Sequence, residues 1–186
     1  MRLETERLIL RPWRDEDRPA FHRLNSDETV MKFFPFRRSR AEADQVLDKL
    51  NRLIAENGFS FSALQRKEDG ALIGICGLHR GGLAPLFPEE TVEIGWRLLP
   101  DYWGKGYVSE AARACLAHGF EAQGLDEIVA FAVHDNYRSL AVMERIGMRH
   151  AAQRDFEHPG IDDRFSHLRP HRTYAISRRD WLAAQA

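Results

Sequence analysis

The sequence predicts an α+β fold in which helices flank a mixed, mostly antiparallel sheet of about six to seven strands. One observation is the amphipathic pattern of residues 39–56, whose apolar side chains recur at helical spacing. Another is the pair of β-rich runs at 59–65 and 72–79, joined by the turn Glu68-Asp69-Gly70. The chain of 186 residues has no repeat and no long linker, so we expect one domain spanning 1–186.

The elements before residue 92 are predicted from short-range patterns. In order they are a strand at 7–13, a helix at 15–25, a helix at 39–56, strands at 59–65 and 72–79, and a loop at 80–90. The second helix has the clearest limits. Ser39 and Glu42 have the spacing of a capping box, and Gly58 follows as a stop.

Strands and helices alternate in the second half of the chain. In order we expect a strand at 92–98, a glycine-containing turn at 102–108, a helix at 109–123, a strand at 127–133, a helix at 137–146, and strands near 148–157 and at 173–177. The period of a strand places Glu93, Gly95 and Arg97 on one face. A glycine inside a strand indicates a bulge or a close approach of another group to the backbone.

The composition argues against several classes of protein. The formal net charge is −1, with 44% hydrophobic and 30% charged residues, so nothing favours binding to nucleic acid or to an anionic membrane. The first residues show no signal-peptide pattern and no apolar run is as long as a membrane span, so we expect a cytoplasmic protein. Cys76 and Cys115 are then expected to be reduced, small and buried. No histidine pair has metal-ligand spacing with the cysteines, so no metal is expected.

The most informative segment runs from a strand through a glycine turn into a helix. Gly104 and Gly106 allow a tight turn, and Ser109 is suited to cap the helix that follows. Free N–H groups at a helix N-terminus bind phosphate, and Lys105 adds a cation. A plain helix-capping turn explains the same residues about equally well. The sequence contains neither the P-loop pattern nor the dinucleotide-binding fingerprint.

The order of motifs along the chain resembles the GNAT superfamily of N-acetyltransferases, and within it the RimJ/RimL-like branch. Residues 103–108, Trp-Gly-Lys-Gly-Tyr-Val, are similar to the loop that binds the pyrophosphate of acetyl-CoA. The wider match consists of residues 4–12, 93–112, 134–139 and 143–148. Trp103 and Val108 depart from the general pattern, which has Gln or Arg at the first position and Gly or Ala at the second. The resemblance implies an acetyl-CoA-dependent N-acetyltransferase.

By this resemblance, acetyl-CoA binds along the strand at 92–98, the glycine turn and the start of the helix at 137. The pantetheine arm would lie between the strands at 92–98 and 127–133, which separate in the family. The cofactor-binding residues that it implies are Ile94, Trp96, Leu98, Trp103, Gly104, Lys105, Gly106, Tyr107, Val108, Ser109, Asn136 and Ser139. Asn136 is also well suited simply to cap its helix.

Two residues are candidates for catalysis. Glu93 would take a proton from the incoming ammonium group, although a structural strand glutamate fits the pattern equally well. By resemblance, Ser139 faces the coenzyme sulfur, where it would donate a hydrogen bond to the leaving thiolate. Many GNAT enzymes have a tyrosine for this purpose seven residues after the asparagine, at the position of Met143 here. Tyr137 is a weaker alternative donor.

The predicted reaction is direct attack of a neutral amine on the thioester in a ternary complex. The resemblance favours a protein N-terminal α-amine as acceptor, but many similar chains acetylate small amines. We expect the acceptor pocket to be lined by 31–36, 80–90 and 156–171, with core packing as the alternative for their phenylalanines. These are Phe33, Phe34, Phe36, Phe87 and Phe156. A non-catalytic acyl-CoA-binding module is a competing function, and a homodimer is one option for the assembly.

Overall fold

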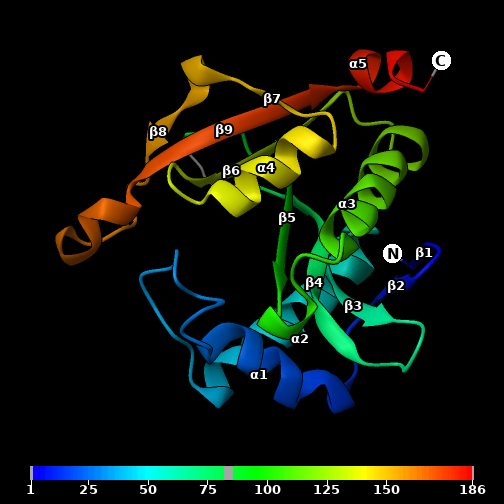
Figure 1. Cartoon of the computed structure of the whole chain (residues 1–186), viewed down its shortest axis with the longest axis vertical. Helices are drawn as coiled ribbons and strands as arrows, with labels where there is room; N and C mark the ends of the chain where they lie inside the picture. The colour runs from blue at the N-terminus through cyan, green and yellow to red at the C-terminus, as the bar shows by residue number, and fades with distance from the viewer. Residues whose placement is uncertain (1, 82–85, 186) are drawn as a thin grey trace.

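The structure of the chain is a computed structural model that describes residues 2–81 and 86–185. Within these residues one sheet has nine strands in the order β1-β2-β3-β4-β5-β6-β9-β7, with β8 paired to β9 (Figure 1). Only the β5–β6 pair is parallel. The strands are β1 Leu3–Glu4, β2 Leu8–Arg11, β3 Phe61–Arg66, β4 Leu72–Arg80, β5 Val92–Leu98, β6 Glu127–Val133, β7 Arg149–His150, β8 Phe156–Glu157 and β9 Pro170–Ser177. The prediction of a mixed, mostly antiparallel sheet is confirmed.

Five α-helices accompany the sheet within the described residues. They are α1 Arg18–Ser26, α2 Arg40–Asn57, α3 Tyr107–Ala117, α4 Tyr137–Arg145 and α5 Arg178–Ala183. Short helical turns are η1 Asp15–Asp17, η2 Pro100–Tyr102, η3 His118–Ala122, η4 Ala152–Arg154 and η5 Asp163–Leu168. None of the helices in the described ranges is long and apolar enough to cross a membrane.

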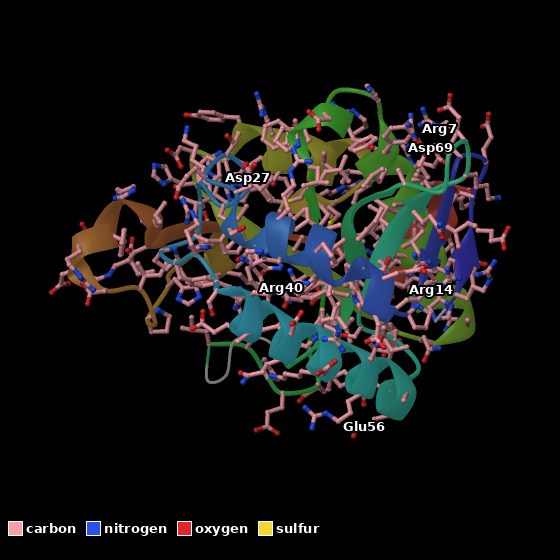
Figure 2. The ribbon with its side chains drawn as sticks, turned by 90° about the horizontal axis from the view of Figure 1, so that it is seen from below. Arg7, Arg14, Asp27, Arg40, Glu56 and Asp69 are labelled. Atoms are coloured by element: carbon pink, nitrogen blue, oxygen red, sulfur yellow. The ribbon has the colours of Figure 1, made fainter. Side chains whose placement is uncertain are left out.

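The helices cover the two faces of the sheet with separate sets of apolar side chains. On one face, Leu47 of α2 and Phe21 of α1 pack with Ile75 of β4. On the other face, Leu116 of α3 and Met143 of α4 belong to the largest core cluster. The helices α1 and α2 lie side by side and run in opposite directions, because α1 leads from near Arg14 to Asp27 and α2 from Arg40 to Glu56 (Figure 2).

Local signals define α2 as the sequence predicts. The Ser39 side chain accepts a hydrogen bond from the Glu42 N–H, and the Glu42 carboxylate accepts one from the Ser39 N–H at 2.8 Å. The helix ends at Gly58, which has a φ of 80° in the left-handed region that glycine adopts without strain. The capping box and the glycine stop are both confirmed.

Several expectations about individual elements are wrong. The sheet has more than six or seven strands because β1, β7 and β8 contain only two residues each, too few to give a period-2 pattern. The single strand expected near 148–157 is therefore two short strands separated by η4. The helix expected over 109–123 begins earlier, at Tyr107, and ends its α-helical part at Ala117. A π-helical turn follows, where Gly119 packs against Ile128.

The strands β5 and β6 separate from each other along their length. Their register contains a single residue pair, Glu93 opposite Val129, near the start of both strands. Beyond this pair, residues 94–98 and 130–133 have no partners across the gap, and the two strands diverge (Figure 1). Where β5 and β6 are not paired with each other, the backbone N–H and C=O groups on their facing edges need other hydrogen-bond partners.

Candidate active site

Strand β5 presents different side chains to the two faces of the sheet. Val92, Ile94 and Leu98 are buried in the core on the α3 side. The expected alternation therefore places Glu93, Gly95 and Arg97 toward α1 and α2. A Cβ on Gly95 would lie 2.9 Å from Cε1 of Phe61, so this glycine marks a close approach. The β4–β5 register is continuous through this position, which excludes the alternative of a bulge.

The glycine turn leads directly into α3 at the end where β5 and β6 have diverged. Gly104 and Gly106 have φ values of 74° and 80°, a conformation that side chains rarely adopt. Gly106 is the N-cap residue, so the expectation that Ser109 caps the helix is wrong. The first helical residues, from Tyr107 to Ser109, have backbone N–H groups without an acceptor among the described residues. They form the kind of donor set that binds phosphate.

Side chains hold the turn against the end of β5 and the start of α4. The Trp103 indole donates a hydrogen bond to the Leu98 carbonyl at 2.8 Å. The Lys105 ammonium donates to the Asp101 carbonyl at 3.0 Å, which keeps its charge at the turn. The Arg138 guanidinium of α4 lies 4.4 Å from the centre of the Trp103 ring. The turn and the first turn of α4 are therefore neighbours at the open end of the two strands.

Arg7, between β1 and β2, supports the same turn from the opposite side. Its Nη1 donates to the Lys105 carbonyl at 3.0 Å, and its Nε donates to the Glu110 carboxylate at 2.6 Å. Its guanidinium lies 4.7 Å from the centre of the Tyr107 ring. Sequence reasoning missed this residue because the contact joins segments about a hundred positions apart.

Asn136 and Ser139 lie at the start of α4. The Asn136 side chain caps the helix by accepting a hydrogen bond from the Ser139 N–H at 3.3 Å. This leaves the Ser139 hydroxyl available as a donor. Met143 is buried in the core, so it contributes packing only. Tyr137 is 72% exposed, which makes it the poorer candidate for a donor to a sheltered thiolate.

Glu93 lies at the last point where β5 and β6 are paired. It is paired with Val129 of β6, and across the β4–β5 pair it lies opposite His79. No cation lies within ion-pair distance of its carboxylate in the described parts of the chain. Burial raises the pKa of Glu93 to about 7. Burial also lowers the pKa of His79, and the positive charge of Lys49 adds to that effect.

Aromatic side chains gather beside β6 on the Glu93 side of the sheet. The Phe87 ring stacks on Phe131 at 6.0 Å and meets Phe156 edge-on at 5.6 Å. A cavity of about 410 Å³ includes Phe87 and Phe156 in its lining. Phe33 and Phe34 instead join two small apolar clusters, so core packing accounts for part of the expected set. Residues 82–85 of the expected loop lie outside the described residues.

The thiols are placed as the sequence predicts. Cys76 and Cys115 are free and fully buried, with their sulfur atoms 4.0 Å apart. The pKa of Cys115 is raised by its contact with Cys76 and by burial. Neither is an accessible nucleophile. In the described ranges, no group of three or more His, Cys, Asp or Glu residues could hold a metal ion.

The comparisons with known proteins identify the class to which this fold and site belong. Residues 7–149 match the family model of the acetyltransferase (GNAT) domain. The chain therefore belongs to the GNAT acetyltransferase family and is an acetyltransferase. The family uses acetyl-CoA as its co-substrate.

Individual relatives support the assignment over most of the chain. The uncharacterized N-acetyltransferase YnaD of Bacillus subtilis is 37% identical over 152 residues, which are 80% of this chain and 83% of the relative. The FsC-acetyl coenzyme A-N(2)-transacetylase of Aspergillus fumigatus is 32% identical, covering 98% of this chain and 79% of the relative. A GNAT-family acetyltransferase from Bacillus anthracis has a similar structure, with a TM-score of 0.80 and 30% identity over 96% of this chain and 99% of that one.

Proposed function

We propose that this enzyme transfers an acetyl group from acetyl-CoA to a primary amine by direct attack in a ternary complex. The observation that carries the proposal is the divergence of β5 from β6 directly beyond Glu93, with the donor-rich glycine turn at the open end. The relative from Aspergillus fumigatus has a name that states acetyl coenzyme A as donor and an N(2) nitrogen as the site of transfer. A single domain over 1–186 is part of the proposal, since β9 lies beyond the family match and completes the sheet beside β6.

In this proposal the cofactor binds in two parts. The pyrophosphate meets the N–H groups from Gly104 to Ser109, beside Lys105. The pantetheine arm lies between the separated strands, where it bonds to the backbone of residues 94–98 and to the side chain of Asn136. The Trp103 indole supports the turn and does not donate to the cofactor, because its N–H already donates to the Leu98 carbonyl.

The chemistry follows from the positions of Glu93 and Ser139. Glu93 accepts the proton of the incoming ammonium group, and a pKa near neutrality suits a general base. The amine nitrogen then attacks the thioester carbon, whose oxygen is polarised by strand N–H groups near Leu98. The carbon–sulfur bond breaks, the nitrogen gives its remaining extra proton to the departing thiolate, and the amide and the free thiol of coenzyme A are formed. The departing thiolate accepts a hydrogen bond from the Ser139 hydroxyl.

The acceptor in the proposal is an α-amine, with a protein N-terminus as the first choice. A relative named putative ribosomal N-acetyltransferase YdaF, from Bacillus subtilis, is 28% identical over 75% of this chain and supports the RimJ/RimL-like branch. A small-molecule amine is the second choice. An α-amine has a pKa of roughly 8 against roughly 10.4 for lysine, so it needs less help to lose its proton. We propose that the reaction takes place in the cytoplasm, where free thiols such as that of Cys76 stay reduced.

The test is a screen of acceptors with acetyl-CoA, with free coenzyme thiol as the readout. The panel contains peptides with free N-termini, amino acids, polyamines and aminoglycosides. We expect amine-dependent thiol release, with the acetylated amine recovered by mass spectrometry. Binding of acetyl-CoA without release for any amine would leave the non-catalytic acyl-CoA-binding module as the function.

A further inference from the structure

A second polar site lies on the same side of β5 as Glu93, at the end of α1. Asn25 is completely buried, and its amide nitrogen donates to the Phe21 carbonyl at 2.8 Å. Its carboxamide oxygen accepts hydrogen bonds from two guanidinium groups, from Arg97 at 3.0 Å and from Arg38 at 3.1 Å. Two cations thus converge on one neutral oxygen.

Neither of these arginines has a carboxylate oxygen within 4.0 Å in residues 2–81 and 86–185. The remaining contacts of Arg97 are the Met31 sulfur at 3.2 Å and the Phe34 ring at 5.3 Å. Glu42 is the acidic residue whose charge acts on Arg38, but its carboxylate already accepts two hydrogen bonds from Ser39 in the capping box.

Two other arginines of the N-terminal part of the chain are paired. Arg37, the neighbour of Arg38, forms an ion pair with Glu28 at 2.8 Å, and buried Arg11 forms one with Asp17 at 2.6 Å. A charge removed from water without a counter-ion is costly, so sheltered charges are normally paired. Burial lowers the pKa of Arg97 to about 10, and the positive charge of Arg38 adds to the effect. Among the described residues, neither the Arg38 nor the Arg97 guanidinium has a counter-ion within ion-pair distance.

Space for a ligand lies beside the Arg38 side chain. A cavity of about 350 Å³ is lined by Phe36, Arg37, Arg38, Glu42, Gln45 and Val46. Arg97 follows Glu93 by four residues on the same face of β5, so their Cα atoms are roughly 13 Å apart. A guanidinium group presents several N–H donors in a planar fork that matches the oxygens of a carboxylate or phosphate.

We propose that Arg38 and Arg97 bind an oxyanion group, carboxylate or phosphate, carried by the acceptor amine. The acceptor is then an anionic amine, such as an amino acid, a phosphorylated amine or a peptide with an acidic residue near its N-terminus. Polyamines and aminoglycosides are disfavoured, since two unpaired cations would repel them. This inference rests on the proposed function, because it names the substrate class of the same site.

The experiment compares kcat/KM for matched acceptors that differ only in the anion. The pairs are leucine with leucinamide, phosphoethanolamine with ethanolamine, and the dipeptide amides Ala-Glu and Ala-Gln. We expect the anionic member of at least one pair to be preferred by roughly tenfold or more, the effect of a hydrogen bond to a charged group. The pair that shows the preference identifies the source of the anion. The amine of leucinamide loses its proton more easily than the amine of leucine. Without an anion-binding site, leucinamide would therefore be the better acceptor of this pair.

Variants connect the preference to the two arginines. Arg38→Gln should reduce the preference for the anionic acceptor to within roughly twofold, since the lost interaction is with a charge. Arg97→Lys keeps the charge, removes the planar fork and should weaken the preference. The control is Arg40→Gln, an exposed arginine at the start of α2 (Figure 2). It should preserve the full preference.

The inference is overturned if the parent enzyme shows no preference for an anion, or if the preference survives in both variants. Amine acetylation without such a preference would leave the proposed function intact. If no amine is acetylated, the proposed function fails, and calorimetry with coenzyme A present compares N-acetylleucine with N-acetylleucinamide. Tighter binding of the acid to the parent than to Arg38→Gln would still support the anion site. Equal affinity of the parent and of Arg38→Gln for N-acetylleucine would overturn the anion site.

Discussion

At the scale of single residues, the environment of Glu93 distinguishes a base from a structural carboxylate. A structural strand glutamate would be expected to have a cationic partner, and a lowered pKa would follow from it. Glu93 has a raised pKa of about 7, caused by burial. It lies beside the opening between β5 and β6, where the acyl group is proposed to bind. These features favour the role of general base.

We predict that Glu93→Gln lowers kcat in a pH-dependent way. The parent rate should fall below a pH of about 7, where Glu93 becomes protonated. At neutral pH the variant should be slower by on the order of a hundredfold, a typical contribution of a general base. Its deficit should shrink as the pH approaches roughly 8, where an α-amine loses its proton unaided. The measurement is a pH–rate profile for both proteins, and a constant rate ratio from about pH 6 to 9 would exclude Glu93 as the base.

Glu93→Gln should raise the stability of the folded protein at high pH, whereas the loss of one partner of an ion pair would lower it. A raised pKa means that the folded protein binds the proton more tightly than the unfolded chain, so stability falls as the pH rises from about 4.5 to about 7. The shift corresponds to on the order of 3 kcal/mol. Glu93→Gln removes this cost. Denaturant titrations should show the variant as stable as the parent near pH 4.5 and more stable at pH 8. Lower stability of the variant at pH 8 would indicate a structural role.

We predict that Ser139→Ala lowers kcat more than it weakens acetyl-CoA binding. The Ser139 backbone N–H already bonds to Asn136, so removing the hydroxyl leaves the helix cap in place. A donor that acts on charge developing in the transition state should be worth roughly tenfold or more in kcat. Steady-state kinetics would measure this, with exposed Tyr137→Phe as the control that should remain unchanged. If Tyr137→Phe is the slower variant instead, the donor is misassigned.

At the scale of elements, the start of α3 combines local and tertiary causes. Glycines in the left-handed region allow the chain to enter the helix with its first N–H groups free. Arg7 then fixes the turn through the Lys105 carbonyl and the Glu110 carboxylate. The phosphate site that we propose therefore needs two things. One is the backbone conformation of the two glycines, which the sequence predicts, and the other is the set of contacts from Arg7, which is distant in the sequence.

We predict that Gly106→Val abolishes the rise in melting temperature that acetyl-CoA produces. A ligand that binds only the native state stabilises it, so this rise reports cofactor binding. A β-branched residue at a φ of 80° is strained by on the order of 1–3 kcal/mol and should displace the N–H groups of the turn. The matched control is Gly124→Val, which has a φ of 66° and open space around a Cβ. The control should lose stability but keep the response to acetyl-CoA; a full response in folded Gly106→Val would refute the phosphate site.

The elements that the sequence predicts well are those with a complete local signal. The bounds of β5 and β6 match the expected residues. The bounds of α2 differ from the expected ones by only one residue at each end, because its capping residues are specific. The start of α3 differs from the prediction because Ser109 is a common capping residue, whereas the N-cap residue is Gly106 in a left-handed conformation. The pairs around β9 and the convergence of Arg38 and Arg97 on Asn25 depend on distant contacts. No local pattern contains them.

At the scale of the whole molecule, the proposed function has the two substrates approach β5 from different sides. The glycine turn, the start of α4 and the gap beyond Glu93 form the proposed cofactor side. The loop between α1 and α2, with Arg38 and the aromatic residues near β6, forms the proposed acceptor side. Glu93 is common to both. The two sites are therefore compatible with simultaneous occupation, and neither requires the other substrate to leave.

We predict a ternary complex, with initial-rate lines that intersect when acetyl-CoA and an acceptor are varied together. A mechanism through an acetyl-enzyme would need an accessible nucleophile, and the thiols of Cys76 and Cys115 are fully buried in the core. The raised pKa of Cys115 further disfavours its thiolate. Parallel lines, together with an acetylated cysteine that passes its acetyl group to the acceptor, would contradict this mechanism. Cys115→Ala is the companion variant: it should cost stability through the cavity it leaves, but its kcat should stay close to that of the parent.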